Sequence, residues 1–210
     1  MSLYADHLFP RLLDLLSRAL EPDRAAVIGR ARGRVLELGF GTGANLPHYG
    51  AGVTEVVGIE PGTGMTHRTR QRIAQLQAAG RPVPDFDLHQ GSAEALPFRD
   101  QSFDTVVAFL VLCTIPDAAT ALHEARRVLR PGGRLLFFEH VRAPEPQLAR
   151  WQDRIDPVWT RIACGCHLNR DTRALIDGSG FSFHDLEAAH HPRMGPKLSN
   201  FVIQGQAVAG

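Results

Sequence analysis

The residues that point most directly to chemistry are alternating glycines flanked by two glutamates. Gly39, Gly41 and Gly43 follow a short apolar run, Glu37 precedes them, and Glu60 ends the next apolar run. Because glycine has no Cβ, such a loop lets a ligand lie directly on the main chain. A carboxylate at the end of the following strand can accept hydrogen bonds from both hydroxyls of a ribose. The spacing therefore predicts a site for a nucleotide-like cofactor that contains adenosine.

The glycine loop alone also fits a permissive dinucleotide fingerprint, Gly39-x-Gly41-x-x-Ala44. The glycine loop is the first of four ordered segments that distinguish a dinucleotide site from another kind of cofactor site. The segments are Glu37-x-Gly39-x-Gly41-x-Gly43, Gly91–Phe98, Phe103-Asp104 and Leu129–Gly133. This set, within residues 33–140, resembles the class I S-adenosylmethionine-dependent methyltransferases. The resemblance implies S-adenosyl-L-methionine as the cofactor, and it makes a nicotinamide dehydrogenase the less favoured interpretation.

The resemblance also assigns cofactor contacts to individual residues of this chain. It implies that the glycines approach the methionine part and the ribose, that Glu37 lies near the methionine ammonium or organises the loop, and that Glu60 binds the ribose. The remaining predicted contacts are to adenine, from Ser92 and the Ala93 main chain, and from Leu110 to the ligand. Serine at position 92 departs from a common variant that has aspartate there, so the adenine contact departs from the usual pattern.

The elements that must position these residues alternate along the chain between apolar runs and helical periodicity. Strands are predicted near 34–39, 53–59, 85–90, 103–110 and 133–140, and helices near 63–79 and 117–130. Such alternation predicts an α/β fold with a doubly wound, mostly parallel sheet. A helix-rich insertion at about 145–164, a helix at 168–178 and strands at 181–190 and 198–208 follow. The family resemblance implies a Rossmann-like sheet of seven strands, with one antiparallel strand near the C-terminus.

The whole chain, residues 1–210, is predicted to form a single class I methyltransferase domain. Residues 1–30 form a helical leader, with helices near 3–20 and 22–29; residues 33–140 form the cofactor-binding part; residues 141–210 form a substrate-side insertion and a C-terminal hairpin. The leader has the apolar spacing of a helix that packs on the core, closes over the site or touches a membrane surface. Peripheral membrane contact therefore stays open.

Charge and cysteine content narrow the class of protein. The 210 residues carry 23 Lys+Arg and 22 Asp+Glu, which does not favour a nucleic-acid substrate. The arginine cluster from Arg126 to Arg134 fits the solvated side and C-terminus of a helix. Three cysteines do not make a disulfide framework, the longest apolar run is too short to span a bilayer, and the first residues lack a basic secretory start. We expect a cytoplasmic protein without an integral membrane segment.

Two residues near the predicted methyl position are candidates for catalysis. His140 ends the fifth strand, and histidine titrates near neutral pH, so it is the candidate general base for a phenol or alcohol acceptor. Cys113 follows the fourth strand and is expected to face the same pocket. The alternatives are that His140 is a hydrogen-bonded structural residue and that Cys113 is a small buried apolar residue.

Later motifs resemble one branch of the superfamily, the methyltransferase-like alkyl thiol methyltransferases and their bacterial relatives. These motifs are Glu139–Ala143, Trp151, Asp156–Trp159 and Gly165–Arg170. The resemblance implies a small, fairly apolar acceptor, possibly a thiol but also a hydroxyl or amine. Trp151, Trp159 and His167 are its predicted substrate-binding residues, since large aromatic side chains form apolar walls with a polar edge.

No metal site is predicted. Cys164-x-Cys166-His167 has metal-binding residue types, but zinc sites bring four ligands in two spaced pairs, and the remaining cluster, His190-His191, falls in a predicted strand. Arsenite methylation through Cys113, Cys164 and Cys166 is a further alternative. Among functions, the rivals are a phospholipid or quinone-precursor methyltransferase, and a non-catalytic module that binds S-adenosylmethionine as a sensor or partner subunit.

Overall fold

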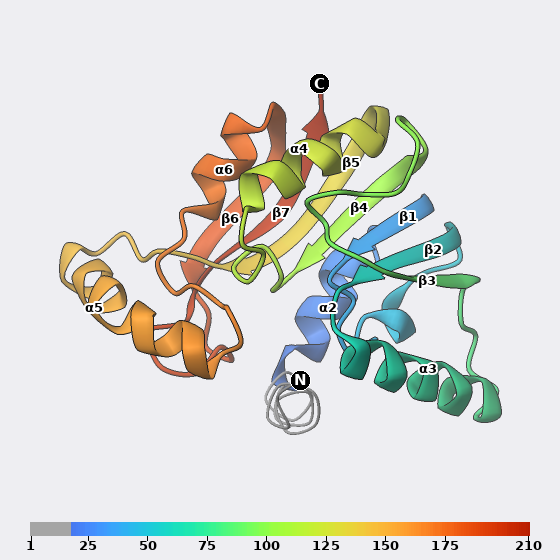
Figure 1. The fold of residues 1–210 in the computed structure, drawn as a ribbon, viewed down its shortest axis with the longest axis horizontal. Helices are drawn as coiled ribbons and strands as arrows, with labels where there is room; N and C mark the ends of the chain where they lie inside the picture. The colour runs from blue at the N-terminus through green and yellow to red at the C-terminus, as the bar shows by residue number, and fades with distance from the viewer. Residues whose placement is uncertain (1–17) are drawn as a thin grey trace.

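A seven-stranded sheet forms the centre of the computed structural model, which describes residues 18–210 (Figure 1). The strand order is β3-β2-β1-β4-β5-β7-β6. The strands are β1 (Gly33–Leu38), β2 (Val53–Glu60), β3 (Phe86–Gln90), β4 (Phe103–Phe109), β5 (Leu129–His140), β6 (Phe181–His190) and β7 (Phe201–Ala209). The helices are α2 (Glu21–Ile28), α3 (Thr63–Ala78), α4 (Ala118–Val128), α5 (Pro146–Ile162) and α6 (Thr172–Gly178), with 3-10 turns η2 (Arg18–Leu20) and η3 (Leu46–His48).

The strand order reverses direction beside β1. β1 pairs in parallel with β2 on one side and with β4 on the other, so Leu36 lies opposite both Val57 and Val106. All three of these side chains are completely buried, as expected for strands covered on both faces. The chain leaving β1 leads to β2 on one side and the chain leaving β4 leads to β5 on the other, which makes this the switch point, where open α/β sheets bind ligands.

Helices cover both faces of this sheet. On one face α4 and α6 lie over β4, β5 and β7, and the α4 residues Ala121, Leu122 and Ala125 are completely buried there. On the other face Val27 and Ile28 of α2 pack in a second apolar cluster. α5 lies beyond the carboxyl end of β5 (Figure 1). None of the described helices combines the length and the apolar composition needed to cross a bilayer.

The structure confirms the predicted α/β class, the seven strands and the antiparallel C-terminal strand. β7 is the antiparallel strand: it lies between β5 and β6 and runs opposite to both. The second helix of the leader is present as α2. The first, predicted near 3–20, lies outside the described residues except for η2.

Element boundaries differ from the prediction at two places. The helix predicted to reach Arg130 ends at Val128, because Leu129 already pairs with Phe103 as the first residue of β5. Gly132 has φ +74° and the register with β4 shifts there, so the predicted glycine turn is an irregularity within the strand. The helix predicted from residue 168 begins at Thr172, where the Asp171 side chain caps it by accepting a hydrogen bond from the Ala174 N–H.

Candidate active site

The glycine loop lies at the carboxyl end of β1 and is tied to the end of β2 by Glu60. One carboxylate oxygen of Glu60 accepts the Gly41 N–H at 3.2 Å and the other accepts the Gly62 N–H at 2.9 Å. Burial raises the pKa of Glu60. Gly62 is the cap of α3, so Glu60 organises the start of this helix as well as the loop. Each carboxylate oxygen keeps a lone pair for a further donor such as a ribose hydroxyl.

Space above the loop is open at Gly41. Its φ is +54°, and a Cβ built on it would meet no heavy atom closer than the Gly39 carbonyl oxygen at 3.9 Å. By contrast, a Cβ on Gly39 would lie 2.3 Å from Val111, and one on Gly43 would lie 2.9 Å from Leu46. Gly41 is therefore the glycine of the three that faces free volume, as a cofactor-binding position requires.

Glu37 is held by a network that the sequence analysis did not identify. Its carboxylate accepts hydrogen bonds from Asn45 Nδ2 at 2.8 Å and from the Tyr49 hydroxyl at 2.6 Å. Asn45 in turn accepts from Arg24 of α2. Burial raises the pKa of Glu37 to about 7, and the two hydrogen bonds and the Arg24 charge only partly oppose this rise. These contacts support the loop-organising role of Glu37.

Ser92 and Ala93 follow β3, next to the end of β2. The Gly91 N–H donates to the Glu60 carbonyl oxygen at 3.2 Å, which keeps this segment beside Glu60, the predicted ribose-binding residue. The Ser92 hydroxyl donates to Glu94 at 2.7 Å and accepts the Glu94 N–H at 3.2 Å. The hydroxyl proton of Ser92 is thus donated within the local turn, and only the hydroxyl oxygen can accept a hydrogen bond from an adenine amino group.

The segment after β4 is shaped by Glu139, another residue that sequence reasoning quoted without a role. Leu110 has φ +54°, a conformation that costs a branched or bulky residue energy and occurs at functional sites. The buried Glu139 carboxylate accepts main-chain N–H groups of Val111 at 2.8 Å, Leu112 at 2.9 Å and Cys113 at 3.3 Å. Burial raises the pKa of Glu139. An acidic residue inside the apolar run Phe137–His140 was the available signal for this anchor.

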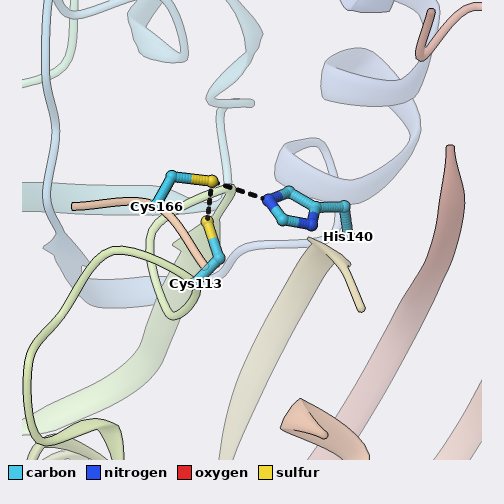
Figure 2. Close-up of side chains that lie close together, drawn as sticks. All are labelled: Cys113, His140 and Cys166. Carbon is cyan, nitrogen blue, oxygen red and sulfur yellow. Dashed lines mark hydrogen bonds between the residues drawn. The ribbon is translucent and has the colours of Figure 1, made fainter. Parts of the chain in front are cut away.

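His140 and Cys113, the two predicted catalytic residues, converge with a third residue, Cys166 (Figure 2). His140 Nε2 lies 2.9 Å from Cys166 Sγ, and Cys166 Sγ lies 3.6 Å from Cys113 Sγ. Contact with Cys113 and burial raise the pKa of Cys166. Burial opposes protonation of His140, but its pKa is nevertheless raised because the Cys166 contact and the Glu139 charge outweigh burial.

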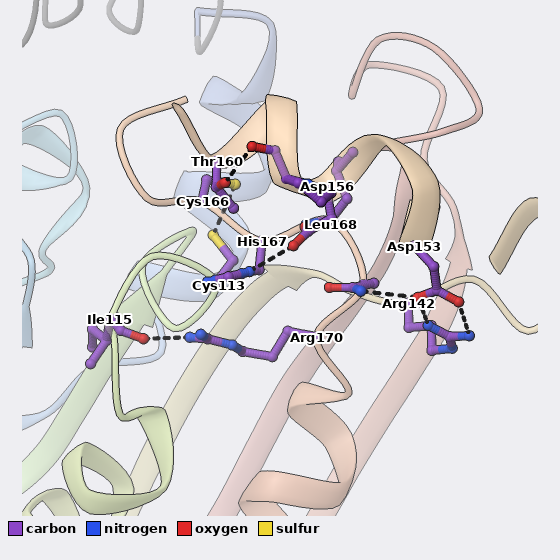
Figure 3. Close-up of polar contacts among 12 residues, drawn as sticks. Cys113, Ile115, Arg142, Asp153, Asp156, Thr160, Cys166, His167, Leu168 and Arg170 are labelled. Carbon is purple, nitrogen blue, oxygen red and sulfur yellow. Dashed lines mark hydrogen bonds and ion pairs between the residues drawn. The ribbon is translucent and has the colours of Figure 1, made fainter. Parts of the chain in front are cut away.

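The segment 163–170 carries Cys166 and is fastened to the loop after β4 (Figure 3). The His167 N–H donates to the Cys113 carbonyl oxygen at 2.9 Å. Arg170 donates to the carbonyl oxygens of Leu112 and Ile115. The buried Asp156 of α5 holds His167 Nδ1 at 2.9 Å and the Leu168 N–H at 2.7 Å. The chain therefore fixes His167 next to Cys113.

The two predicted substrate-binding tryptophans lie in different environments on α5. The Trp159 indole Nε1 is buried and has no hydrogen-bond partner in the described structure. Trp151 is 55% exposed, and the Arg154 guanidinium lies 5.5 Å from its ring centre. Trp151 therefore faces solvent in the described part of the chain, whereas Trp159 directs a polar group inward. Their role in acceptor binding stays a prediction.

The predicted cofactor residues lie together at the carboxyl ends of β1, β2, β3 and β4, and the two predicted catalytic residues lie at the ends of β4 and β5. The sequence did not reveal the role of several further residues that hold this arrangement together, some of which lie within the motifs quoted above. They are Arg24, Asn45, Tyr49, Glu139, Asp156, Cys166 and Arg170. Most of them act through a partner distant in sequence, which explains why local spacing did not reveal them.

Residues 36–137 match the methyltransferase domain family. The chain is 33% identical to the human thiol S-methyltransferase TMT1B over 201 residues, covering 88% of this chain and 79% of the human protein. It is 36% identical to rat TMT1B over 154 residues, 73% of this chain, and spans 62% of the rat protein's length. A phosphatidylethanolamine N-methyltransferase of Cereibacter sphaeroides is 35% identical over 62% of this chain and 66% of its own length.

A crystal structure from Thermotoga maritima shares the fold. It is described as a SAM-dependent methyltransferase, and it superposes with a TM-score of 0.68 at 21% sequence identity, over 98% of this chain and 99% of that one. At this identity the likeness concerns the fold, and it extends through α5 and the C-terminal strands as well as the segment that matches the domain family.

Proposed function

Because the chain belongs to the class I S-adenosylmethionine-dependent methyltransferases, we propose that it transfers a methyl group to a small, fairly apolar acceptor, with a thiol sulfur as the preferred nucleophile. When bound, S-adenosylmethionine supplies an electrophilic methyl group on a sulfonium. The observation that carries the proposal is the Glu60–Gly41 hydrogen bond below open volume, which presents a buried carboxylate and bare main chain to a ribose-containing ligand.

The residues present fit this cofactor. Glu60 binds the ribose hydroxyls, Gly41 allows the ligand to lie on the loop, and Glu37 keeps the loop in shape through Asn45 and Tyr49. Ser92 and the Ala93 main chain lie next to Glu60 for adenine. Leu110 contributes an apolar contact at the end of β4. Positioning of this kind supplies much of the catalysis of a displacement reaction.

The acceptor site lies between the end of β5 and α5. Trp159 and His167 form its wall, and Trp151 lies further along α5 at the surface. A thiol needs only to lose its proton to become a strong nucleophile, whereas an alcohol needs a positioned base. His140, next to Cys113 and Cys166, is the residue to which the acceptor proton passes. All three cysteines are free thiols, which fits a cytoplasmic location.

Similarity to the thiol S-methyltransferases TMT1B supports sulfur as the acceptor atom, since the human protein aligns with most of this chain, beyond the cofactor-binding part. The similarity to the bacterial phosphatidylethanolamine N-methyltransferase supports a second candidate, methylation of a lipid amine. Relatives named demethylmenaquinone methyltransferases match half of the chain and extend that candidate to quinone precursors. A non-catalytic module that binds the cofactor is the alternative from another class.

The experiment that tests the proposal is a methyl-transfer screen with S-adenosylmethionine labelled on its methyl group. Small alkyl thiols, phenols, amines and phosphatidylethanolamine vesicles are offered separately, after calorimetric titration with S-adenosylmethionine and S-adenosylhomocysteine. We expect binding of both ligands and label in the thiols. Label only in the vesicles would establish the lipid candidate. Binding without label in any acceptor would favour the non-catalytic module.

A further inference from the structure

We propose that Cys113, His140 and Cys166 bind a zinc ion and leave one coordination position open, which receives a thiol acceptor as a thiolate. The three residues come from the ends of β4 and β5 and from the segment after α5, and their side chains point toward one another (Figure 2). The part of this proposal that concerns the acceptor rests on the proposed function. The part that concerns the metal rests on geometry alone.

Two of the three pairs of ligand atoms lie near the separation that a tetrahedral zinc ion requires. All lie within 4.8 Å of one another, and the two sulfur atoms are 3.6 Å apart. With zinc–sulfur bonds of about 2.3 Å, tetrahedral geometry places two sulfur atoms about 3.8 Å apart. His140 Nε2 lies 2.9 Å from Cys166 Sγ, and the pair would have to separate by about 0.6 Å to reach the roughly 3.5 Å set by a zinc–nitrogen bond of about 2 Å.

Both loops that carry the cysteines are already fixed. The Glu139 carboxylate accepts the Cys113 N–H, and Arg170 donates to the carbonyl oxygen of Leu112. Arg170 also donates to the carbonyl oxygen of Ile115 (Figure 3). The His167 N–H bond to the Cys113 carbonyl oxygen joins the two cysteine-bearing segments directly. A site whose supporting hydrogen bonds are made by the protein alone binds a metal without an ordering cost.

The hydrogen bonds within this cluster are weak ones, because each involves a thiol. His140 is buried, and its Nδ1 has no hydrogen-bond partner in the described structure. The contact with Cys166 is therefore the polar contact that orients the imidazole ring. Thiols are weak donors and weak acceptors, which makes the two cysteines poor partners for a buried imidazole. Thiolate sulfur and imidazole nitrogen are instead the ligands that zinc prefers.

No fourth protein ligand is available to the cluster in the described part of the chain. Within residues 18–210, the cluster that can hold a metal contains these two cysteines and this histidine and no further ligand. The adjacent Glu139 carboxylate is taken by three main-chain N–H groups. Three protein ligands with a vacant position characterise catalytic zinc sites, whereas structural sites have four.

Binding of zinc and then of a thiol at this site would release three protons. Binding of the ion as Zn²⁺ releases one proton from Cys113 and one from Cys166, while His140 binds as the neutral imidazole through Nε2. A thiol that enters the open position releases a third proton to solvent and remains bound as a thiolate. It keeps a lone pair for attack on an electrophilic methyl group. In the metal-bound state the cation, rather than the His140 base, therefore makes the acceptor nucleophilic.

The test uses the full chain, freed of metal and then titrated with Co²⁺, which occupies zinc sites and reports thiolate ligands through a charge-transfer absorption band. We expect one equivalent of Co²⁺, tetrahedral ligand-field bands, and displacement by Zn²⁺. Cys166→Ser should weaken binding by at least about 100-fold, because it removes one of three ligands. Cys164→Ser is the matched control: Cys164 lies two residues away outside the cluster, and this variant should bind as the parent does.

A second arm adds a small alkyl thiol without S-adenosylmethionine. A changed ligand-field spectrum and release of one further proton would support the open position, and an unchanged spectrum would overturn it. No thiolate band in the parent chain, or an equal band in Cys166→Ser with retained circular dichroism, would overturn the metal site. If metal binding fails while thiols are methylated, the proposed function stands without zinc. If cobalt binds and no thiol is methylated, the metal site stands and the acceptor assignment fails.

Discussion

The Glu60 carboxylate accepts the Gly41 N–H at 3.2 Å and so joins the end of β2 to the loop that follows β1. This contact spans the switch point of the sheet, where the strand order reverses beside β1. It fixes the one glycine of the loop whose missing Cβ leaves free volume. The carboxylate, the bare main chain and the open space above them therefore form one structural unit.

Gly41→Val should abolish binding of S-adenosylmethionine while the chain stays folded, because the branched side chain would fill the space intended for the ligand. Gly132→Val is the matched control: Gly132 also has a positive φ, +74°, and its added Cβ would also meet no atom. Both variants should lose about 1–2 kcal/mol of stability from the strained backbone. Calorimetric titration should show lost binding only for Gly41→Val. Unchanged affinity there would remove the loop from the site.

Glu60→Gln should weaken the binding of S-adenosylmethionine and of S-adenosylhomocysteine by the same factor, since both carry the ribose that Glu60 is proposed to bind. Hydrogen bonds to a charged group are worth about 1.5–3 kcal/mol, which corresponds to roughly 10- to 100-fold in affinity. Glu55→Gln is the control on the same strand, because Glu55 pairs with Arg34 at 2.6 Å instead. A Glu60→Gln variant that discriminates between the two ligands would place Glu60 near the sulfur rather than the ribose.

Glu37→Gln should change how stability depends on pH. Burial raises the pKa of Glu37 from 4.5 to about 7, so its protonated form is favoured in the folded state. The stability that this proton provides is fully present below the ordinary pKa and is lost as the pH rises through about 7. The parent chain should therefore lose about 3 kcal/mol relative to Glu37→Gln across this window. Urea unfolding of both chains at several pH values measures the difference. If the free energy of unfolding changes with pH in the same way for both, the pKa of Glu37 is not raised.

Trp159→Phe should change stability by no more than about 1 kcal/mol, because removal of a buried indole N–H that has no partner in the described structure offsets the packing lost with the smaller ring. Trp151→Phe, at the exposed tryptophan of the same helix, should change stability by no more than about 0.5 kcal/mol. If Trp159 lines the acceptor site, its variant should also change the KM for the acceptor without changing cofactor affinity. An unchanged KM would make Trp159 a core residue.

Local sequence determined the strands, the glycine loop and the acidic end of β2. These features depend on residue type and short spacing: buried parallel strands need continuous apolar runs, and a loop that approaches a ligand needs glycine. The predicted α/β class, the glycine loop and Glu60 follow from that reasoning, whereas the contacts assigned to Ser92, Ala93 and Leu110 came from the family resemblance. The antiparallel β7 followed from the family resemblance, and the boundaries near Leu129 and Thr172 were missed because strand pairing and capping decided them.

Only the tertiary structure decided which side chains meet beyond these motifs. Cys166 lies 26 residues from His140 and 53 from Cys113 in sequence, and no periodicity relates them. These residues meet because the segment after α5 lies against the ends of β4 and β5. Hydrogen bonds of Asp156 and Arg170 hold that segment in place. The same holds for Asn45 and Tyr49 on Glu37. Spacing along one element sets which face a residue occupies, but contacts between separate loops are set by packing.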